Sequence, residues 1–198
     1  MTNGDASSPG AGDVEAGAGT FTKLGERPIY DGAVISLAVG EFSGPGGVSF
    51  HRDIVHHPGA VSAVPLLDDG TVVLVRQFRA ALGVDLLEIP AGKRDVADEP
   101  PELTARRELE EEIGMRAGRV ELLAEFHNSP GFCDEHSFVY LARDLVETAT
   151  DLQGIEEQHL TVERAALADV PAMIADRRIT DAKSIIGLLL ALRHVEER

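Results

Sequence analysis

Cysteine is almost absent from the sequence, since Cys133 is the only one among 198 residues. An internal disulfide therefore cannot form, which favours a reducing compartment. Long apolar runs are also lacking: the longest one near the C-terminus covers residues 185–192 and is too short to span a membrane. The first residues have neither the basic region nor the apolar run of a signal peptide. These absences predict a cytoplasmic protein with no membrane partner.

Positively charged residues are also few. Lysine and arginine total 18 against 34 acidic residues, so the formal net charge is −16 and the pI is near 4.7. This balance excludes general affinity for nucleic acid or anionic membranes. The proportions of hydrophobic residues (43%) and charged residues (26%) are ordinary, and the length suits one globular domain. Local cations would have to attract any phosphate-bearing substrate.

The chain divides into three regions. Residues 1–20 are rich in Gly, Ala, Ser and Asp and nearly lack large apolar side chains, so we expect a disordered tail. Residues 21–57 hold short apolar runs separated by turn residues, which predicts a small antiparallel sheet. Residues 58–198 carry the remaining strand and helix patterns and are expected to form the main domain.

Strand and helix patterns alternate in the main domain. Apolar and β-branched residues at 61–67 and 71–78, joined by Asp68-Asp69-Gly70, predict a hairpin. A helix should begin at Pro100 or Pro101 and end before Gly114. Further strands are expected at 86–90, 120–126, 137–141 and 161–163, and further helices at 170–177 and 182–195. This order indicates an α/β sandwich.

The most informative segment is the acidic end of the first helix. Glu108, Glu111 and Glu112 have the spacing i, i+3, i+4, so their carboxylates share one helix face. Like charges at this spacing repel, and the macrodipole disfavours anions at a helix C-terminus. Both costs are relieved by a cation, and hard oxygen ligands favour Mg²⁺ or Mn²⁺. A solvated acidic surface is the alternative, and the glutamates alone do not decide between the two.

The residues around the glutamates resemble the Nudix box. That motif is Gly, five residues, Glu, seven residues, then Arg-Glu-hydrophobic-x-Glu-Glu-x-Gly-hydrophobic, and it matches completely from Glu99 through Arg107 to Met115. One departure lies between Gly92 and Glu99, where six residues stand in place of five. Asp98 occupies the strict position, but register with the helix favours Glu99.

The Nudix resemblance implies an α/β/α sandwich with a mixed sheet, preceded here by the small antiparallel sheet, and a magnesium-dependent hydrolase (Mn²⁺ as an alternative). The family's metal ligands fall on Glu108, Glu111 and Glu112, and in relatives acting on ADP-ribose a backbone carbonyl joins them, which falls on Ala91. The arginine of the box, Arg107, is expected to orient a glutamate.

Segments outside the box resemble ADP-ribose pyrophosphatases. The strand containing Glu88, the Gln77-Phe78-Arg79 pattern and the loop from Ser129 to Glu135 all match that group. The resemblance implies a substrate-binding role, and the candidates for it are Arg79, Glu88, Pro130, Phe132 and Glu135. Each has a plainer interpretation: a turn between strands for the loop, and a surface position for Arg79.

A general base is expected in the acidic stretch after Asp151. The resemblance places it on Glu157, with Glu156 as the neighbour to which a shift of register would move it. A solvated loop glutamate is the alternative. Cys133 has no implied histidine partner for nucleophilic chemistry, and His56, His57 and His127 make no recognisable zinc spacing.

The expected reaction is hydrolysis of ADP-ribose to AMP and ribose 5-phosphate. Another sugar nucleotide, NADH or FAD is the alternative substrate, and a non-catalytic domain that senses ADP-ribose is a third interpretation. The resemblance also implies a homodimer in which residues 21–55 pack against the partner. The sequence predicts a small-molecule ligand and no nucleic acid or membrane partner.

Overall fold

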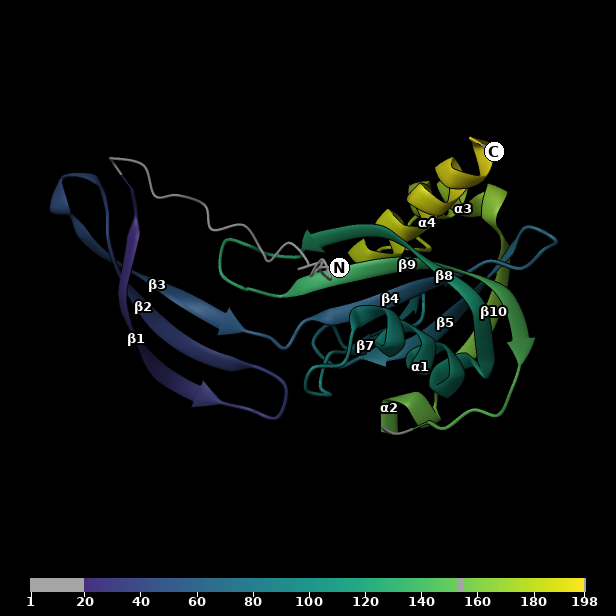
Figure 1. Cartoon of the computed structure of the whole chain (residues 1–198), viewed down its shortest axis with the longest axis horizontal. Helices are drawn as coiled ribbons and strands as arrows, with labels where there is room; N and C mark the ends of the chain where they lie inside the picture. Colours follow the sequence, from purple (N-terminus) through teal and green to yellow (C-terminus); the bar gives the residue numbers. More distant parts are fainter. Residues whose placement is uncertain (1–19, 153–154, 198) are drawn as a thin grey trace, which may run out of the picture.

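The computed structural model describes residues 20–152 and 155–197. Its N-terminal strands form an antiparallel sheet in the order β1 (Thr22–Asp31), β2 (Ser36–Ser43) and β3 (Ser49–His56), with a short 3₁₀ turn, Pro45–Gly47, between β2 and β3. This sheet extends away from the rest of the chain (Figure 1), and every residue of β1 is exposed. The predicted N-terminal antiparallel sheet is thus confirmed, while the predicted tail at residues 1–20 lies, except for Thr20, outside the described residues.

A mixed four-stranded sheet lies at the centre of the main domain. Its order is β7 (Ala91–Lys93), β4 (Ala60–Pro65), β9 (His136–Glu147) and β8 (Met115–His127), and β4 and β9 are parallel. All six residues of β4 are buried, as expected for an apolar strand covered on both faces. The N-terminal ends of β4 and β9 therefore lie at the same end of the sheet, where β7 pairs with the first residues of β4.

A second sheet contains β10 (Thr161–Ala166), β5 (Thr71–Arg79) and β6 (Val84–Glu88), all antiparallel. The predicted hairpin between residues 61–67 and 71–78 is therefore wrong beyond its turn. Leu67 and Thr71 are hydrogen-bonded and Leu66 bridges Val72, but β4 then continues into one sheet and β5 into the other. The two strands separate because β9 pairs with β4 and β10 pairs with β5.

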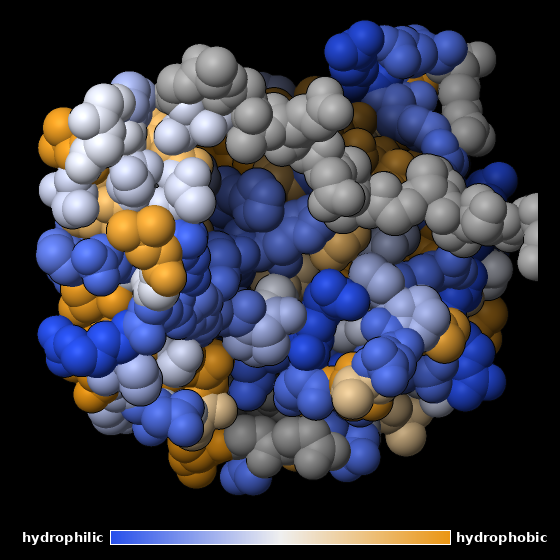
Figure 2. Space-filling model, turned by 60° about the vertical axis from the view of Figure 1, so that its left-hand side comes forward, coloured by the Kyte–Doolittle hydropathy of each residue, from blue (hydrophilic) through white to orange (hydrophobic). Residues whose placement is uncertain are grey.

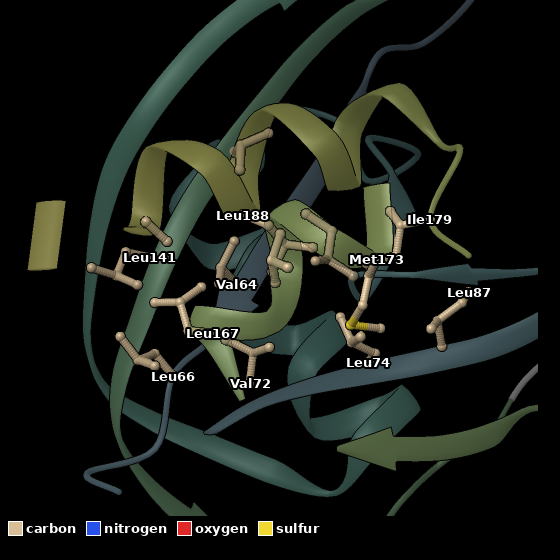
Figure 3. Packing of buried hydrophobic residues seen from close by; sticks show 14 residues of the cluster. Val64, Leu66, Val72, Leu74, Leu87, Leu141, Leu167, Met173, Ile179 and Leu188 are labelled. Atoms are coloured by element: carbon tan, nitrogen blue, oxygen red, sulfur yellow. The ribbon is translucent and has the colours of Figure 1, made fainter. Parts of the chain in front are cut away.

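Helices cover both faces of this arrangement. Helix α1 (Pro101–Ile113) lies on one side, while α3 (Val170–Ala175) and α4 (Ala182–Glu196) lie on the other (Figure 1). The apolar core beneath α3 and α4 includes Val64, Leu74, Leu141 and Leu188 (Figure 3). The remaining short helices are the 3₁₀ turn Leu167–Asp169 and α2 (Ile155–Gln158). The predicted α/β/α sandwich is confirmed, and no helix of the described residues is long and apolar enough to cross a membrane.

Helix α1 has sharp boundaries that the sequence predicts. Pro101 occupies the first turn, where its missing N–H costs no hydrogen bond. Gly114 ends the helix in the left-handed conformation (φ 61°), and its N–H donates to the carbonyls of Glu110 and Leu109. Ala105, Leu109 and Ile113 of this helix pack into the core, and the flanking face, which carries Glu108, Glu111 and the buried Glu112, borders a cleft.

Candidate active site

A cleft of about 650 Å³ lies where α1, β7 and the end of β5 meet. With the N-terminal side of the molecule turned forward, Figure 2 shows hydrophilic side chains over the middle of this face and apolar ones scattered around it. The lining brings together residues that are far apart in the sequence: Val34, His57, Ala60, Gln77, Phe78, Arg79, Ala80, Ala91, Gly92, Lys93, Asp95, Arg107, Glu108, Glu111, Glu112, Glu135 and Lys183.

Three of the five glutamates of α1, Glu108, Glu111 and Glu112, line the cleft, and Arg107 holds two of these three together. Its Nη1 lies 2.9 Å from a carboxylate oxygen of Glu108 and 2.9 Å from one of Glu111. Its Nη2 lies 3.4 Å from Glu99. Burial disfavours the charge of Arg107, but the carboxylates, Glu108 foremost, attract it more strongly, so the pKa of Arg107 is raised. The guanidinium thus offsets the like-charge repulsion that the helix spacing creates.

Strand β7 approaches α1 so closely that a side chain at position 92 would displace the Glu108 carboxylate. A Cβ there would lie 1.9 Å from both Cδ and Oε1 of Glu108. The neighbouring Ala91 donates its N–H to Oε2 of Glu112 over 3.1 Å, and Glu112 is buried. The backbone of β7 therefore sets the positions of two of the three glutamates.

The extra residue between Gly92 and Glu99 is absorbed in the loop. Asp98 adopts a left-handed conformation (φ 59°), which aspartate tolerates better than most residues. Glu99 then accepts a hydrogen bond from the Thr104 hydroxyl over 2.9 Å and faces Arg107. Glu99, rather than Asp98, thus supports the arginine of the motif.

Carboxylate oxygens are the type of donor that a hard divalent cation prefers. Glu108, Glu111 and Glu112 present only oxygen donors to one cleft, and the carbonyl of Ala91 belongs to the strand that touches two of them. No group of three or more metal-ligating side chains in residues 20–152 and 155–197 is arranged ready to hold an ion. In this conformation Arg107 and the Ala91 N–H engage carboxylate oxygens instead.

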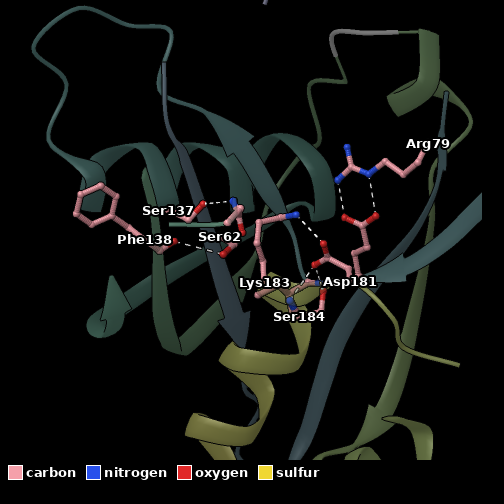
Figure 4. Close-up of polar contacts among 10 residues, drawn as sticks. Ser62, Arg79, Ser137, Phe138, Asp181, Lys183 and Ser184 are labelled. Atoms are coloured by element: carbon pink, nitrogen blue, oxygen red, sulfur yellow. Dashed lines mark hydrogen bonds and ion pairs between the residues drawn. The ribbon is translucent and has the colours of Figure 1, made fainter. Parts of the chain in front are cut away.

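Arg79 and Glu88 form a bidentate pair at the other side of the cleft (Figure 4). Nε of Arg79 donates to Glu88 over 2.8 Å and Nη2 donates over 2.5 Å. The hydrogen bonds that Arg79 donates to Glu88 raise the pKa of Arg79 against the opposing effect of burial. Glu88 is only 1% exposed and does not line the cleft. Its carboxylate holds Arg79 in this structure, and a direct substrate contact by Glu88 stays a prediction.

The loop after β8 brings only part of its predicted site to the cleft. Glu135 lines the cleft, but Pro130 and Phe132 are exposed outside it. The loop is fastened to β3 instead, because Val55 donates its N–H to the carbonyl of Phe132 and accepts from the N–H of Asp134.

Histidine 56, which showed no motif in the sequence, reinforces this attachment. Its Nδ1 lies 2.5 Å from Asp134 and its Nε2 lies 2.7 Å from Glu26 of β1. We call Glu26, His56 and Asp134 the histidine clasp. The clasp joins the N-terminal sheet to the loop that carries Glu135.

The predicted base, Glu157, belongs to α2 by its backbone, but its side chain and that of Glu156 lie outside the described residues. Two cleft residues to which the sequence assigned no role are His57, which was weighed only as a zinc ligand, and Lys93. Gln77 stood in the Gln77-Phe78-Arg79 pattern that resembles ADP-ribose pyrophosphatases, but neither Gln77 nor Lys183 received a role from the sequence. In the sequence, Gln77 stands two residues before Arg79, and Lys183 stands at the start of a predicted helix.

Comparison with known proteins agrees with the geometry. A model of the NUDIX domain matches residues 56–185. The ADP-ribose pyrophosphatase of Bacillus subtilis (strain 168) is 38% identical over 165 residues, which cover 83% of this chain and 89% of that protein. The ADP-ribose pyrophosphatase of Mycobacterium tuberculosis is 36% identical, covering 85% of this chain and 82% of that protein.

Two further similar proteins act on nucleotide compounds, according to their names. A GDP-mannose pyrophosphatase of Yersinia pestis is 37% identical over 132 residues, covering 63% of this chain and 66% of that protein. A solved ADP compounds hydrolase has the same fold, with a TM-score of 0.79 at 20% identity over 94% of this chain and 98% of that one. From the match over residues 56–185 and these identities, the chain belongs to the Nudix hydrolase family.

Proposed function

We propose that the protein hydrolyses the diphosphate bond of ADP-ribose, with AMP and ribose 5-phosphate as products, and that it depends on Mg²⁺ or Mn²⁺. The observation that carries this proposal is the convergence of Glu108, Glu111 and Glu112 with Arg79 on one cleft. The names of the Bacillus subtilis and Mycobacterium tuberculosis relatives support the choice of ADP-ribose.

The residues divide into an acidic and a basic side. We assign metal binding to Glu108, Glu111, Glu112 and the carbonyl of Ala91. When bound, the ion would neutralise phosphate charge and make a water molecule more acidic. Arg107 keeps Glu108 and Glu111 oriented toward the cleft. Glu157 is proposed as the base that takes the proton of the attacking water.

Substrate contacts are assigned to the opposite side. Arg79 is held at Nε and Nη2 by Glu88, which leaves its Nη1 directed to a ligand in the cleft it lines. Glu135 would accept from a sugar hydroxyl. As the water oxygen bonds to phosphorus, the bond from phosphorus to the bridging oxygen breaks, and that oxygen leaves as part of the second phosphate. Substrate contacts by Pro130 and Phe132 remain part of the proposal, and they would require the loop to move toward the cleft.

A substrate panel tests this proposal. ADP-ribose, ADP-glucose, GDP-mannose, NADH, FAD and ATP are compared by specificity constant with Mg²⁺, and products are identified by chromatography. We expect the highest value for ADP-ribose. Glu112→Gln, which keeps the volume but removes an anionic ligand, should lose turnover by orders of magnitude and keep its melting temperature. Wild-type turnover in that variant would overturn the ligand assignment.

GDP-mannose is the second candidate substrate. The identity to the Yersinia pestis relative is close to that of the ADP-ribose pyrophosphatases, although it spans fewer residues. Its diphosphate would meet the same glutamates, so the two candidates differ in what binds the base and the sugar. A higher specificity constant for GDP-mannose would move the assignment there and leave the acidic helix unchanged.

We further propose that the protein acts as a cytoplasmic homodimer. The basis for the dimer is the N-terminal sheet, whose strand β1 exposes all its residues, including Leu24, Ile29 and Tyr30. A second copy would bury this apolar surface. The turn between β1 and β2 already reaches the cleft through Val34, so a dimer would form close to the active site.

A further inference from the structure

Lysine is rare in this chain, and its placement is uneven. The sequence holds three lysines, Lys23, Lys93 and Lys183, against fifteen arginines. Two of the three, Lys93 and Lys183, line the cleft. Lys183 is the more buried of the two: its side chain is only 17% exposed, whereas Lys93 is exposed. An ammonium that is mostly withdrawn from water needs compensating partners.

A buried network holds the Lys183 ammonium in place (Figure 4). Nζ donates to Oδ1 of Asp181 over 2.7 Å, and Asp181 is 11% exposed. The other oxygen of Asp181 accepts from both the N–H and the hydroxyl of Ser184, so Asp181 caps the N-terminus of α4. The Ser184 oxygen in turn accepts from the N–H of Ile89, two residues before Ala91. The lysine is therefore linked, through Asp181 and Ser184, to the segment that joins β6 to β7 at the glutamate site.

The electrostatics of Asp181 agree with this geometry. Burial tends to raise the pKa of Asp181, but Lys183 and Ser184 lower it more, so the carboxylate stays ionised beneath the ammonium. Asp181 also acts on Arg79, whose charge it favours together with Glu88 and Glu112. Lys183 and Arg79 thus belong to one basic side of the cleft.

Lys183 has donors left over for a ligand. An ammonium has three N–H groups, and within the described part of the chain only Asp181 accepts from this one. By contrast, Arg107 is engaged by glutamates and Arg79 by Glu88. In a protein of net charge −16, a fixed ammonium with free donors is suited to a phosphate oxygen.

We propose that Lys183 binds a non-bridging phosphate oxygen of the diphosphate, and that Asp181 and Ser184 are positioning residues that hold it there. This proposal rests on the proposed function only for the class of ligand, a nucleoside diphosphate. It does not require that ADP-ribose be the preferred member of that class.

The first experiment compares Lys183→Met and Lys183→Arg with Arg193→Met as control. Arg193 lies on the same helix but is 72% exposed near its far end, so its loss removes the same charge away from the cleft. Lys183→Met should raise KM for ADP-ribose and the Kd for ADP by roughly 10- to 100-fold, the range for losing a hydrogen bond to a charged group. It should also flatten the dependence of the Kd on salt. Lys183→Arg should recover most of the loss.

If Lys183→Met had the same KM for ADP-ribose and the same Kd for ADP as Arg193→Met, the proposed contact between Lys183 and the phosphate would be overturned. The same conclusion follows if Lys183→Met weakens binding only in proportion to a lower melting temperature and leaves the salt dependence unchanged, because that pattern indicates a structural role. Binding of ADP is measured by calorimetry and needs no turnover. If the wild type hydrolyses none of the panel, the proposed function fails, while the Kd values for ADP still decide the role of Lys183.

A double-mutant cycle tests the positioning role. Asp181→Asn keeps an oxygen that can cap α4 but removes the charge beneath Lys183. It should raise the Kd for ADP by less than Lys183→Met does, and it should add nothing further in the Lys183→Met background. Additive effects of the two substitutions would show that Asp181 acts independently of the lysine and would overturn its assignment.

Discussion

At Gly92 the chain has no room for a side chain. Because an added Cβ would lie 1.9 Å from the carboxylate of Glu108, that carboxylate must move in Gly92→Ala. Displacing a ligand or reacting group by about 1 Å can lower turnover about 100-fold. We therefore expect a loss of that order in kcat, with a melting temperature that changes little, since Glu108 lies at the cleft rather than in the core.

The control for this substitution is Gly131→Ala, where a Cβ would meet nothing within 4 Å. Steady-state kinetics and thermal unfolding of both variants provide the comparison. If Gly92→Ala kept wild-type kcat, the close approach of β7 would be irrelevant to catalysis.

Single residues also show what the sequence could and could not predict about the site. The spacing of Glu108, Glu111 and Glu112 is local, so the helix period alone places them on one face. The partners of Arg79 and Lys183 are set by tertiary contacts: Glu88 reaches Arg79 across two paired strands, and Lys183 depends on where α4 begins. The sequence therefore did not predict the pairing of Glu88 with Arg79, and it assigned no role to Lys183.

Among the elements, the histidine clasp links β1, the end of β3 and the loop after β8. The hydrogen bond to Asp134, followed by that to Glu26, raises the pKa of His56. The two carboxylates have lowered pKa values and stay ionised at neutral pH, so the charged imidazolium is the form that can donate to both.

The pH dependence follows from the direction of that shift. Because the folded-state pKa is raised, the stability that protonated His56 contributes is complete below its unfolded pKa of about 6.5 and is lost as pH rises through the folded pKa. The difference in unfolding free energy between wild type and His56→Gln should therefore be largest near pH 6 and should shrink toward pH 9. Chemical denaturation at several pH values measures it, and His51→Gln controls for losing an imidazole from the same strand.

A difference that stayed constant or grew with pH would contradict the assignment of charge to His56. The experiment has a second readout in the loop itself. Since the clasp holds the segment that ends at Glu135, KM should rise in His56→Gln at pH 6 as well.

The elements themselves were predicted unevenly. The bounds of α1 follow from Pro101 and Gly114, which act within one turn of the helix. The strands at 60–65 and 71–79 carry equally apolar patterns, and nothing local records that β4 pairs with β9 while β5 pairs with β10. Strand pairings between residues more than seventy positions apart could therefore not be predicted from the sequence, although the turn at Asp68–Gly70 was predicted.

At the scale of the whole molecule, the proposed dimer can be tested on β1. Leu24→Glu combined with Ile29→Glu places two charges on its exposed apolar surface and should convert a dimer to a monomer. Light scattering after size exclusion measures the mass. Val146→Glu, at another exposed apolar position, is the control and should leave the mass unchanged.

Salt should act on the dimer in a definite direction. Each copy carries a net charge of −16, so mutual repulsion is screened as ionic strength rises and the dimer should tighten. A wild-type protein that is monomeric at micromolar concentration in 0.5 M salt would refute the dimer.

The uneven placement of the three lysines has a practical consequence for handling the protein. Reagents that acylate amines, including many fluorophores, cross-linkers and surface-coupling chemistries, have few side chains to choose from, and two of these line the cleft. Because Lys93 is exposed, random labelling would modify the site whose function is to be measured. Immobilisation or tagging through another functional group would leave that site intact.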